Sequence, residues 1–225
     1  MSLSLPTTHS VPSHRVLSTG FDSLDSALGT GGFPRSFLVD VVAREAALPA
    51  ARQLLLRTVA RQQADGRIAY WVDAGQELEL PVAAAVGVRA AELLISQPEA
   101  LEHLFEVLLA VLRSQAIDFV VVDGLEAVAT TASAATHSRH LRQLYTAVRR
   151  FSASVVFLRT KRDLNDAQRA AGGELVRHYS SIRCEVKRAA PAEGQGGQLA
   201  LVKVLKNQFA APFAEALVAV GPEAL

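Results

Sequence analysis

From residue 16 onward, hydrophobic residues follow two patterns that alternate along the chain. Short apolar runs rich in β-branched residues are typical of buried strands, and they occupy 37–42, 68–73, 93–96, 119–123 and 154–158. Apolar residues three or four positions apart predict helices over 48–64, 78–86, 99–114 and 137–151. Strands that alternate with helices predict an α/β fold, with a mostly parallel twisted sheet flanked by helices.

The last third of the chain has a different pattern. Two apolar runs, 181–188 and 199–206, are separated by a stretch rich in Pro and Gly, which predicts a C-terminal antiparallel hairpin. A final strand is expected over 217–220. Residues 1–15 are rich in Ser, Thr and Pro and are expected to form a flexible N-terminal arm. Since no repeat is present, 16–225 is interpreted as a single core domain.

Composition narrows the class of protein. Half of the 225 residues are hydrophobic and a fifth are charged, which is typical of a globular domain and not of a disordered chain. No apolar run approaches the roughly 18 residues of a membrane span. No secretory signal is recognisable in 1–14, so a cytoplasmic location without membrane contact is expected. The single cysteine, Cys184, cannot form an internal disulfide and is expected to be a core thiol.

Charge is distributed unevenly along the chain. The formal net charge is only +1, yet 139–188 contains 12 Lys or Arg against 4 Asp or Glu. The rest of the chain contains 11 basic residues against 18 acidic ones. A locally basic surface is therefore expected, although whole-molecule basicity gives no argument for nucleic acid.

Two aspartates, Asp73 and Asp123, each end a predicted strand. In open parallel sheets, ligands bind beyond the carboxyl ends of the strands. An aspartate after an apolar strand is the Walker B arrangement, in which the carboxylate helps to hold Mg²⁺ with nucleotide phosphates. An aspartate at a strand end is equally compatible with a helix cap or an ordinary carboxylate, so a phosphate-binding loop is needed to decide.

That loop would lie between the first predicted strand and the helix over 48–64. Phosphate-binding loops use glycines, whose backbone N–H groups surround phosphate oxygens, followed by a lysine and a Ser or Thr. Here Pro49 stands where the lysine should be and Ala50 where the hydroxyl should be. The segment is interpreted as a degenerate nucleotide site that includes Ala43, Glu45, Leu48, Pro49, Ala50 and Asp123. We expect no nucleotide, no other cofactor and no ATPase activity.

Several segments resemble the bacterial recombinase RecA, in the same order over 17–213. They are 17–34, 70–74, 94–98, 118–124, 172–183 and 203–213. The last of these, which includes Lys203-Val-Leu-Lys-Asn-Gln-Phe-Ala-Ala-Pro-Phe213, is similar to the Lys-Asn-Lys segment of RecA's last hairpin. The resemblance implies a RecA-like core.

The departures from RecA are equally informative. Gly75 stands where RecA has the glutamate that activates water, and Gln208 replaces the second lysine of the Lys-Asn-Lys run. No counterpart of RecA's N-terminal polymerisation arm or C-terminal domain is recognisable. A RecA core with these losses is similar to the ImuA class of RecA-like proteins, which accompany an inactive polymerase homologue and an error-prone polymerase. SulA-type division inhibitors also lack the Walker motif but are shorter.

The resemblance places two DNA-binding loops at 129–139 and 159–173. Flexible glycines and clustered cations suit a phosphate backbone, so weak, salt-sensitive and sequence-independent DNA binding is expected. The candidate DNA contacts are Arg139, Arg159, Lys161, Arg162, Arg169 and, in the matched helix that follows, Arg177. His137 is a further possible phosphate partner. The alternative is a solvated basic face with pairs such as Arg162 with Asp166.

No metal site is expected, because neither His140 nor His178 has acidic or cysteine partners at ligand spacing. The resulting hypothesis is a non-catalytic, RecA-like, DNA-binding accessory of translesion synthesis in the SOS response to DNA damage. RecA and the mutagenesis polymerase proteins are the partners that the resemblance implies. A division inhibitor or RecA-filament modulator that acts only through protein contacts is the first alternative. An ATPase with an unconventional site is the second.

Overall fold

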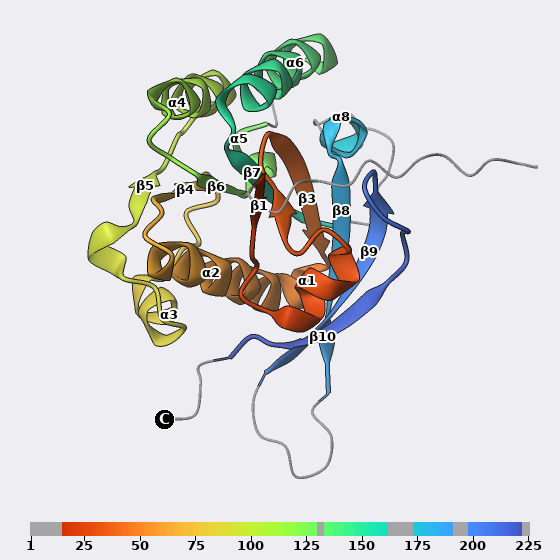
Figure 1. The fold of residues 1–225 in the computed structure, drawn as a ribbon. Helices are drawn as coiled ribbons and strands as arrows, with labels where there is room; N and C mark the ends of the chain where they lie inside the picture. The colour runs from red at the N-terminus through yellow and green to blue at the C-terminus, as the bar shows by residue number, and fades with distance from the viewer. Residues whose placement is uncertain (1–14, 130–132, 162–172, 191–197, 222–225) are drawn as a thin grey trace, which may run out of the picture.

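The computed structural model describes residues 15–129, 133–161, 173–190 and 198–221. Its main feature is an eight-stranded sheet with the strand order β10-β9-β8-β3-β7-β6-β4-β5 (Figure 1). The strands of this sheet are β3 (Phe37–Ala43), β4 (Ala69–Asp73), β5 (Leu94–Ser96), β6 (Phe119–Asp123), β7 (Ser154–Thr160), β8 (Ile182–Ala189), β9 (Leu199–Asn207) and β10 (Glu215–Ala219). A separate antiparallel pair joins β1 (Val16–Leu17) to β2 (Phe33–Pro34).

The fold class predicted from the sequence is confirmed. Strands β3 to β8 pair in parallel, whereas β8, β9 and β10 pair antiparallel and form the C-terminal hairpin and its added strand. The helices are α1 (Asp22–Leu28), α2 (Leu48–Ala64), α3 (Leu80–Ala85), α4 (Leu101–Ser114), α5 (Leu125–Val128), α6 (Ala134–Phe151) and α8 (Gly173–Tyr179). Short 3₁₀ turns cover Glu45–Ala47 and Ala90–Glu92.

The sheet separates two hydrophobic cores. Successive side chains of a strand point to opposite faces, so β3 sends Val39 and Val41 toward α2 and Leu38 toward α6. Helices α1, α2 and α3 cover the first face, and α4, α6 and α8 cover the second (Figure 1). We call these the α2 face and the α6 face.

Element boundaries differ from the sequence-based expectation where side-chain hydrogen bonds set them. Helix α6 begins at Ala134 instead of residue 137, because the Ser133 hydroxyl accepts a 3.1 Å hydrogen bond from the Thr136 amide and caps the helix. Helix α1 was not predicted, because it is only seven residues long. Asp25 holds it in place by accepting hydrogen bonds from the Thr19 amide and hydroxyl.

Candidate functional site

The connection between β3 and α2 is a tight turn. The amide of Ala47 donates to the Arg44 carbonyl at 2.7 Å, and the 3₁₀ turn Glu45–Ala47 runs directly into α2. These amides are therefore used within the turn. Ala43 and Ala50 are buried, whereas Glu45 and Pro49 are exposed and Leu48 is half-buried.

Arg52, in the second turn of α2, reaches across to the end of β6. Its Nε lies 2.6 Å from Asp123 Oδ2, and its Nη2 lies 2.6 Å from Glu77 Oε2 and 3.4 Å from Asp123 Oδ1. The Arg52 and Asp123 side chains are 14% and 4% exposed, whereas that of Glu77 is 59% exposed. One guanidinium thus joins a buried carboxylate to an exposed one.

The electrostatics of this group follow from its burial. Burial raises the pKa of the Asp123 carboxyl, against the opposing hydrogen bond and charge of Arg52. Burial alone would lower the pKa of Arg52, but its contacts with Asp123 and Glu77 outweigh that effect and raise this pKa. Arg52 therefore supplies the positive charge that compensates the buried Asp123.

Asp73 lies beside Asp123 in the sheet register but makes different contacts. Its carboxylate accepts hydrogen bonds from the Glu77 amide at 2.9 Å, the Leu78 amide at 3.3 Å and the Gln97 side chain at 2.9 Å. Asp73 therefore organises the turn that presents Glu77 to Arg52.

Two glycines meet at this edge of the sheet. The Gly75 amide donates to the Asp123 carbonyl at 3.2 Å. Gly124 has a φ of +79°, and a Cβ there would lie 2.7 Å from the Gly75 nitrogen, so a side chain at Gly124 would force the backbone apart. A Cβ at Gly75 would meet only ordinary contacts, with Gly124 Cα at 3.6 Å as the nearest.

A cavity of about 180 Å³ remains beside Arg52 and Glu77. This is smaller than the roughly 300 Å³ at which ligand pockets usually begin. Its other lining residues are Glu45, Leu48, Pro49 and Thr160. The structure therefore brings several of the sequence-predicted site residues together, and adds Arg52 and Glu77, which the sequence reasoning missed.

A second arginine–aspartate pair lies on the α6 face. Arg159 Nε and Nη2 each lie 2.9 Å from the two carboxylate oxygens of Asp40. Asp40 is fully buried and the Arg159 side chain is 7% exposed. Arg183 Nε lies 3.4 Å from the same carboxylate, and the first residue of α8, Gly173, covers the Arg159 guanidinium.

This burial corrects the prediction that Arg159 is a DNA contact. Its guanidinium faces an interior carboxylate, so it has no free surface for a phosphate. His137 is corrected in the same way, because it is fully buried and its Nδ1 lies 3.0 Å from the Ser133 carbonyl oxygen.

The other candidate DNA contacts have different positions. Lys161 is half-buried and its Nζ lies 2.5 Å from Glu185 Oε1. Arg139 on α6 is exposed, and so is Arg177 on α8, which lies 3.4 Å from Glu174. Arg162 and Arg169 lie outside the described residues.

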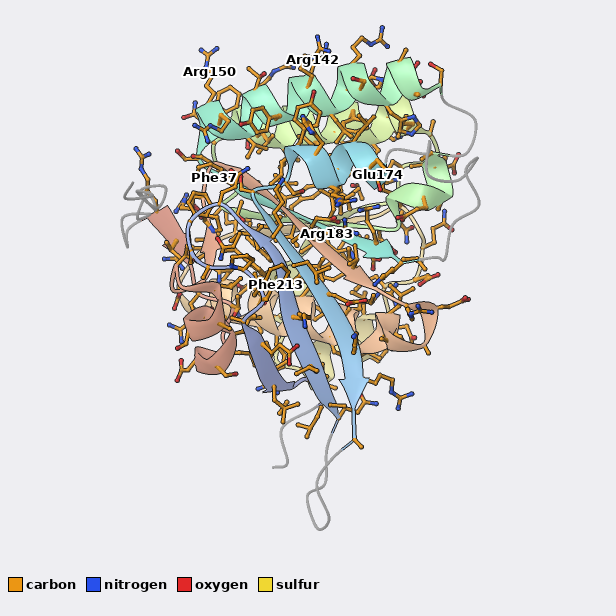
Figure 2. All side chains as sticks on the ribbon, turned by 90° about the vertical axis from the view of Figure 1, so that its right-hand side faces the viewer. Phe37, Arg142, Arg150, Glu174, Arg183 and Phe213 are labelled. Atoms are coloured by element: carbon orange, nitrogen blue, oxygen red, sulfur yellow. The ribbon has the colours of Figure 1, made fainter. Side chains whose placement is uncertain are left out.

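Two further cations lie near Arg177. Arg183 lies on β8 next to α8 (Figure 2). Lys206 Nζ donates to the carbonyls of Arg177 and His178 at 3.1 and 3.2 Å. Burial lowers the pKa of both Arg183 and Lys206, and the charge of Arg177 lowers each further. We call Arg177, Arg183 and Lys206 the α8 basic cluster.

Other chemistry is limited in the part of the chain that the structure describes. No group of three or more His, Cys, Asp or Glu residues there could hold a metal ion. None of the described helices has both the length and the apolar character needed to cross a bilayer. The prediction for Cys184 is confirmed, since it is 1% exposed, and burial raises the pKa of its thiol to about 12.

Known proteins resemble this chain over most of its length. The family model for the RecA N-terminal domain matches residues 3–221. Protein RecA 1 of Myxococcus xanthus is 33% identical over 222 residues, which cover 89% of this chain and 64% of that protein. Protein RecA of Streptococcus mutans is 31% identical over 229 residues, covering 91% and 59%. Protein RecA of Desulforapulum autotrophicum is 32% identical, covering 88% and 62%. The chain thus spans less than two thirds of the length of these relatives.

Proposed function

The chain belongs to the RecA family, and we propose that it is a DNA-binding member without ATPase activity. Its role is that of an accessory protein of the ImuA class in damage-induced mutagenesis, in the cytoplasm. It acts there with RecA, with an error-prone polymerase complex, or with both. The observation that carries the proposal is the position of Arg52 between Asp123 and Glu77.

Arg52 supports the absence of nucleotide chemistry because it already neutralises the carboxylate at the Walker B position. A Mg²⁺ ion held there needs the carboxylate oxygens of Asp123, to which Arg52 donates at 2.6 and 3.4 Å. Pro49 offers neither an amine nor an amide proton to a phosphate. The residues of this site therefore do not fit a magnesium–nucleotide complex.

DNA binding is supported by exposed cations without an interior role. Arg139 is the last residue of the first proposed loop segment and lies on α6, and Arg177 lies on α8, which follows the second segment. Arg162 and Arg169 belong to the same basic segment of the sequence. Such cations neutralise phosphates and release counterions, which gives affinity without base preference.

One observation favours the alternative function, a regulator that acts only through protein contacts. Of the first two cations in the proposed second loop, Arg159 is buried against Asp40 and Lys161 is paired with Glu185. Of the predicted DNA contacts, Arg162, Arg169, Arg139 and Arg177 then remain.

The experiment is a fluorescence anisotropy titration of labelled single- and double-stranded DNA over a salt series, with and without Mg²⁺ and ATP. We expect affinity that falls with salt, by about 0.7 in log K per contacted phosphate and decade of salt for single strands. ATP should change nothing. The Arg162→Glu/Arg169→Glu variant should bind at least about tenfold more weakly at low salt.

Arg61→Glu is the control, because Arg61 is a half-exposed arginine of α2, outside the basic segment 139–188. It reverses one charge where the double variant reverses two, so a loss in log K of more than twice that of Arg61→Glu identifies the surface and not the total charge. If the unmodified protein does not bind DNA at low salt, DNA binding is wrong and the protein-contact regulator replaces it.

A further inference from the structure

A groove of about 420 Å³ lies between α4 and α6, on the outer side of the α6 face. Its floor is mainly apolar and includes Leu109, Ala147 and Phe151. Three arginines line its edges, Arg113 from α4 and Arg142 and Arg150 from α6. Figure 2 shows Arg142 and Arg150 projecting outward from α6.

The charges of these three arginines are not balanced within the described part of the chain. None of the three makes an ion pair with an acidic residue in the described part of the chain, and no Asp or Glu there lines the groove. Arg150 lies over the Phe151 ring at 5.4 Å, which keeps its guanidinium beside the apolar floor. The groove therefore combines an apolar floor with uncompensated positive edges.

We propose that this groove docks an acidic, amphipathic segment of a partner protein. Carboxylates of such a segment would meet the three arginines, and one or two apolar side chains would fill the floor. Arg142 and Arg150 are eight residues apart on a helix, so the positive edge extends for about 12 Å. That length matches two turns of a docked helix.

A nucleic acid fits the same groove less well. Its phosphates could contact the arginines, but its sugar–phosphate backbone has no apolar side chain to fill the floor, and its bases would need an exposed aromatic face to stack there. The aromatic ring here, Phe151, is half-buried and already carries Arg150. An apolar floor between charged edges is therefore better matched by aliphatic side chains with carboxylates.

The test uses a fluorescein-labelled peptide of about 14 residues, with leucines at i and i+4 and glutamates flanking them. A second peptide carries glutamine in place of every glutamate, and labelled oligothymidylate is the nucleic-acid probe. The protein variants are Arg142→Glu/Arg150→Glu, the charge-neutral Thr146→Trp, whose exposed residue lines the groove, and the control Arg61→Glu.

We expect saturable binding of the acidic peptide, weakened at least about tenfold by Arg142→Glu/Arg150→Glu and clearly by Thr146→Trp. Arg61→Glu should bind the acidic peptide as tightly as the unmodified protein does. Thr146→Trp should bind oligothymidylate as tightly as the unmodified protein does. No binding of the acidic peptide, or equal binding of the glutamine peptide, overturns the proposal. So does a charge reversal that weakens only oligothymidylate, which would identify a nucleic-acid surface. Failure of DNA binding in the Arg162→Glu/Arg169→Glu experiment would leave this proposal unaffected.

Discussion

The two buried arginine–aspartate pairs lie on opposite faces of one sheet and differ in what surrounds them. Arg159 and Asp40 bind each other through two parallel hydrogen bonds between neighbouring strands, under the start of α8. Arg52 and Asp123 meet at the end of a strand, and Arg52 also contacts the exposed Glu77 beside a cavity. The first pair is the more deeply buried, with side chains 7% and 0% exposed, whereas those of the second are 14% and 4% exposed beside the cavity.

This difference in burial indicates that the two pairs have different roles. The Arg159 and Asp40 side chains are 7% and 0% exposed, so this pair has little surface to offer a ligand and mainly supports the fold. A pair at the carboxyl edge of parallel strands occupies the position at which such sheets bind ligands. We interpret the Arg159–Asp40 pair as structural, whereas the Arg52–Asp123 pair is the one on which the proposed function rests.

The largest predicted effect is on the Arg159–Asp40 pair. Arg159→Met removes the two hydrogen bonds that the fully buried Asp40 carboxylate accepts from Arg159 and leaves it only the more distant Arg183, so the free energy of unfolding should fall by about 3–5 kcal/mol. Urea denaturation measures this loss. Adding Asp40→Asn should recover a large part of it, because the poorly compensated buried charge is then gone. Equal losses in the single and double variants would contradict this interpretation.

A smaller loss is predicted at the Arg52–Asp123 pair. Arg52→Ala removes the partner of the Asp123 carboxylate, but Arg52 lines the cavity, so water can take the place of its side chain and we expect a loss of about 1–3 kcal/mol. The same urea experiment compares the two arginines directly. A loss larger than that of Arg159→Met would reverse the ranking of the pairs.

The reactivity of Cys184 offers a chemical measure of how strongly each pair stabilises the fold. Cys184 lies on β8 opposite Val41 of β3, next to Asp40. With a thiol pKa of about 12 and 1% exposure, it should react with a thiol reagent at pH 8 only after opening. The labelling rate should rise by at least about 100-fold in Arg159→Met and by less in Arg52→Ala. Fast labelling of the unmodified protein would show that β8 is open in the native state.

The smallest effect concerns the partly exposed pair of Lys161 and Glu185. Burial would raise the pKa of Glu185, but Lys161, Lys187 and Arg44 outweigh it and lower this pKa. A carboxyl with a lowered folded-state pKa stabilises the fold above its unfolded pKa of about 4.3 and loses this contribution as pH falls through the folded value. Glu185→Gln should therefore flatten the decline of the urea midpoint below about pH 5. An unchanged decline would mean that the Lys161–Glu185 pair contributes nothing to the stability of the fold.

The main elements of the fold could be predicted because the spacing of their apolar residues reflects which side chains are buried. The apolar run at 119–123 is a strand buried on both faces, and helix 48–64 has the observed bounds. The short helix α1 could not, because the side-chain hydrogen bonds of Asp25 hold it in place, and these join residues that no periodicity connects.

The candidate site was predictable only in part. The end of β6 and the turn before α2 followed from motifs, but Arg52 and Glu77 are 25 residues apart and meet only in the fold. A signal for Arg52 existed, since it lies one helical turn after Leu48 and Pro49 and so faces the same strand ends. Arg159 was misread because β7 is two residues longer than expected, which places Arg159 within the sheet opposite Val42, from where its side chain reaches Asp40.

The most direct test of the central claim is equilibrium binding of a fluorescent ATP analogue in the presence of Mg²⁺. If Arg52 has taken the place of the bound cation at Asp123, the unmodified protein should show no saturable binding up to about 1 mM nucleotide, a concentration at which even a millimolar site is half filled. Saturable, Mg²⁺-dependent binding that Asp123→Asn abolishes would contradict the account and return this chain to the nucleotide-binding members of its family.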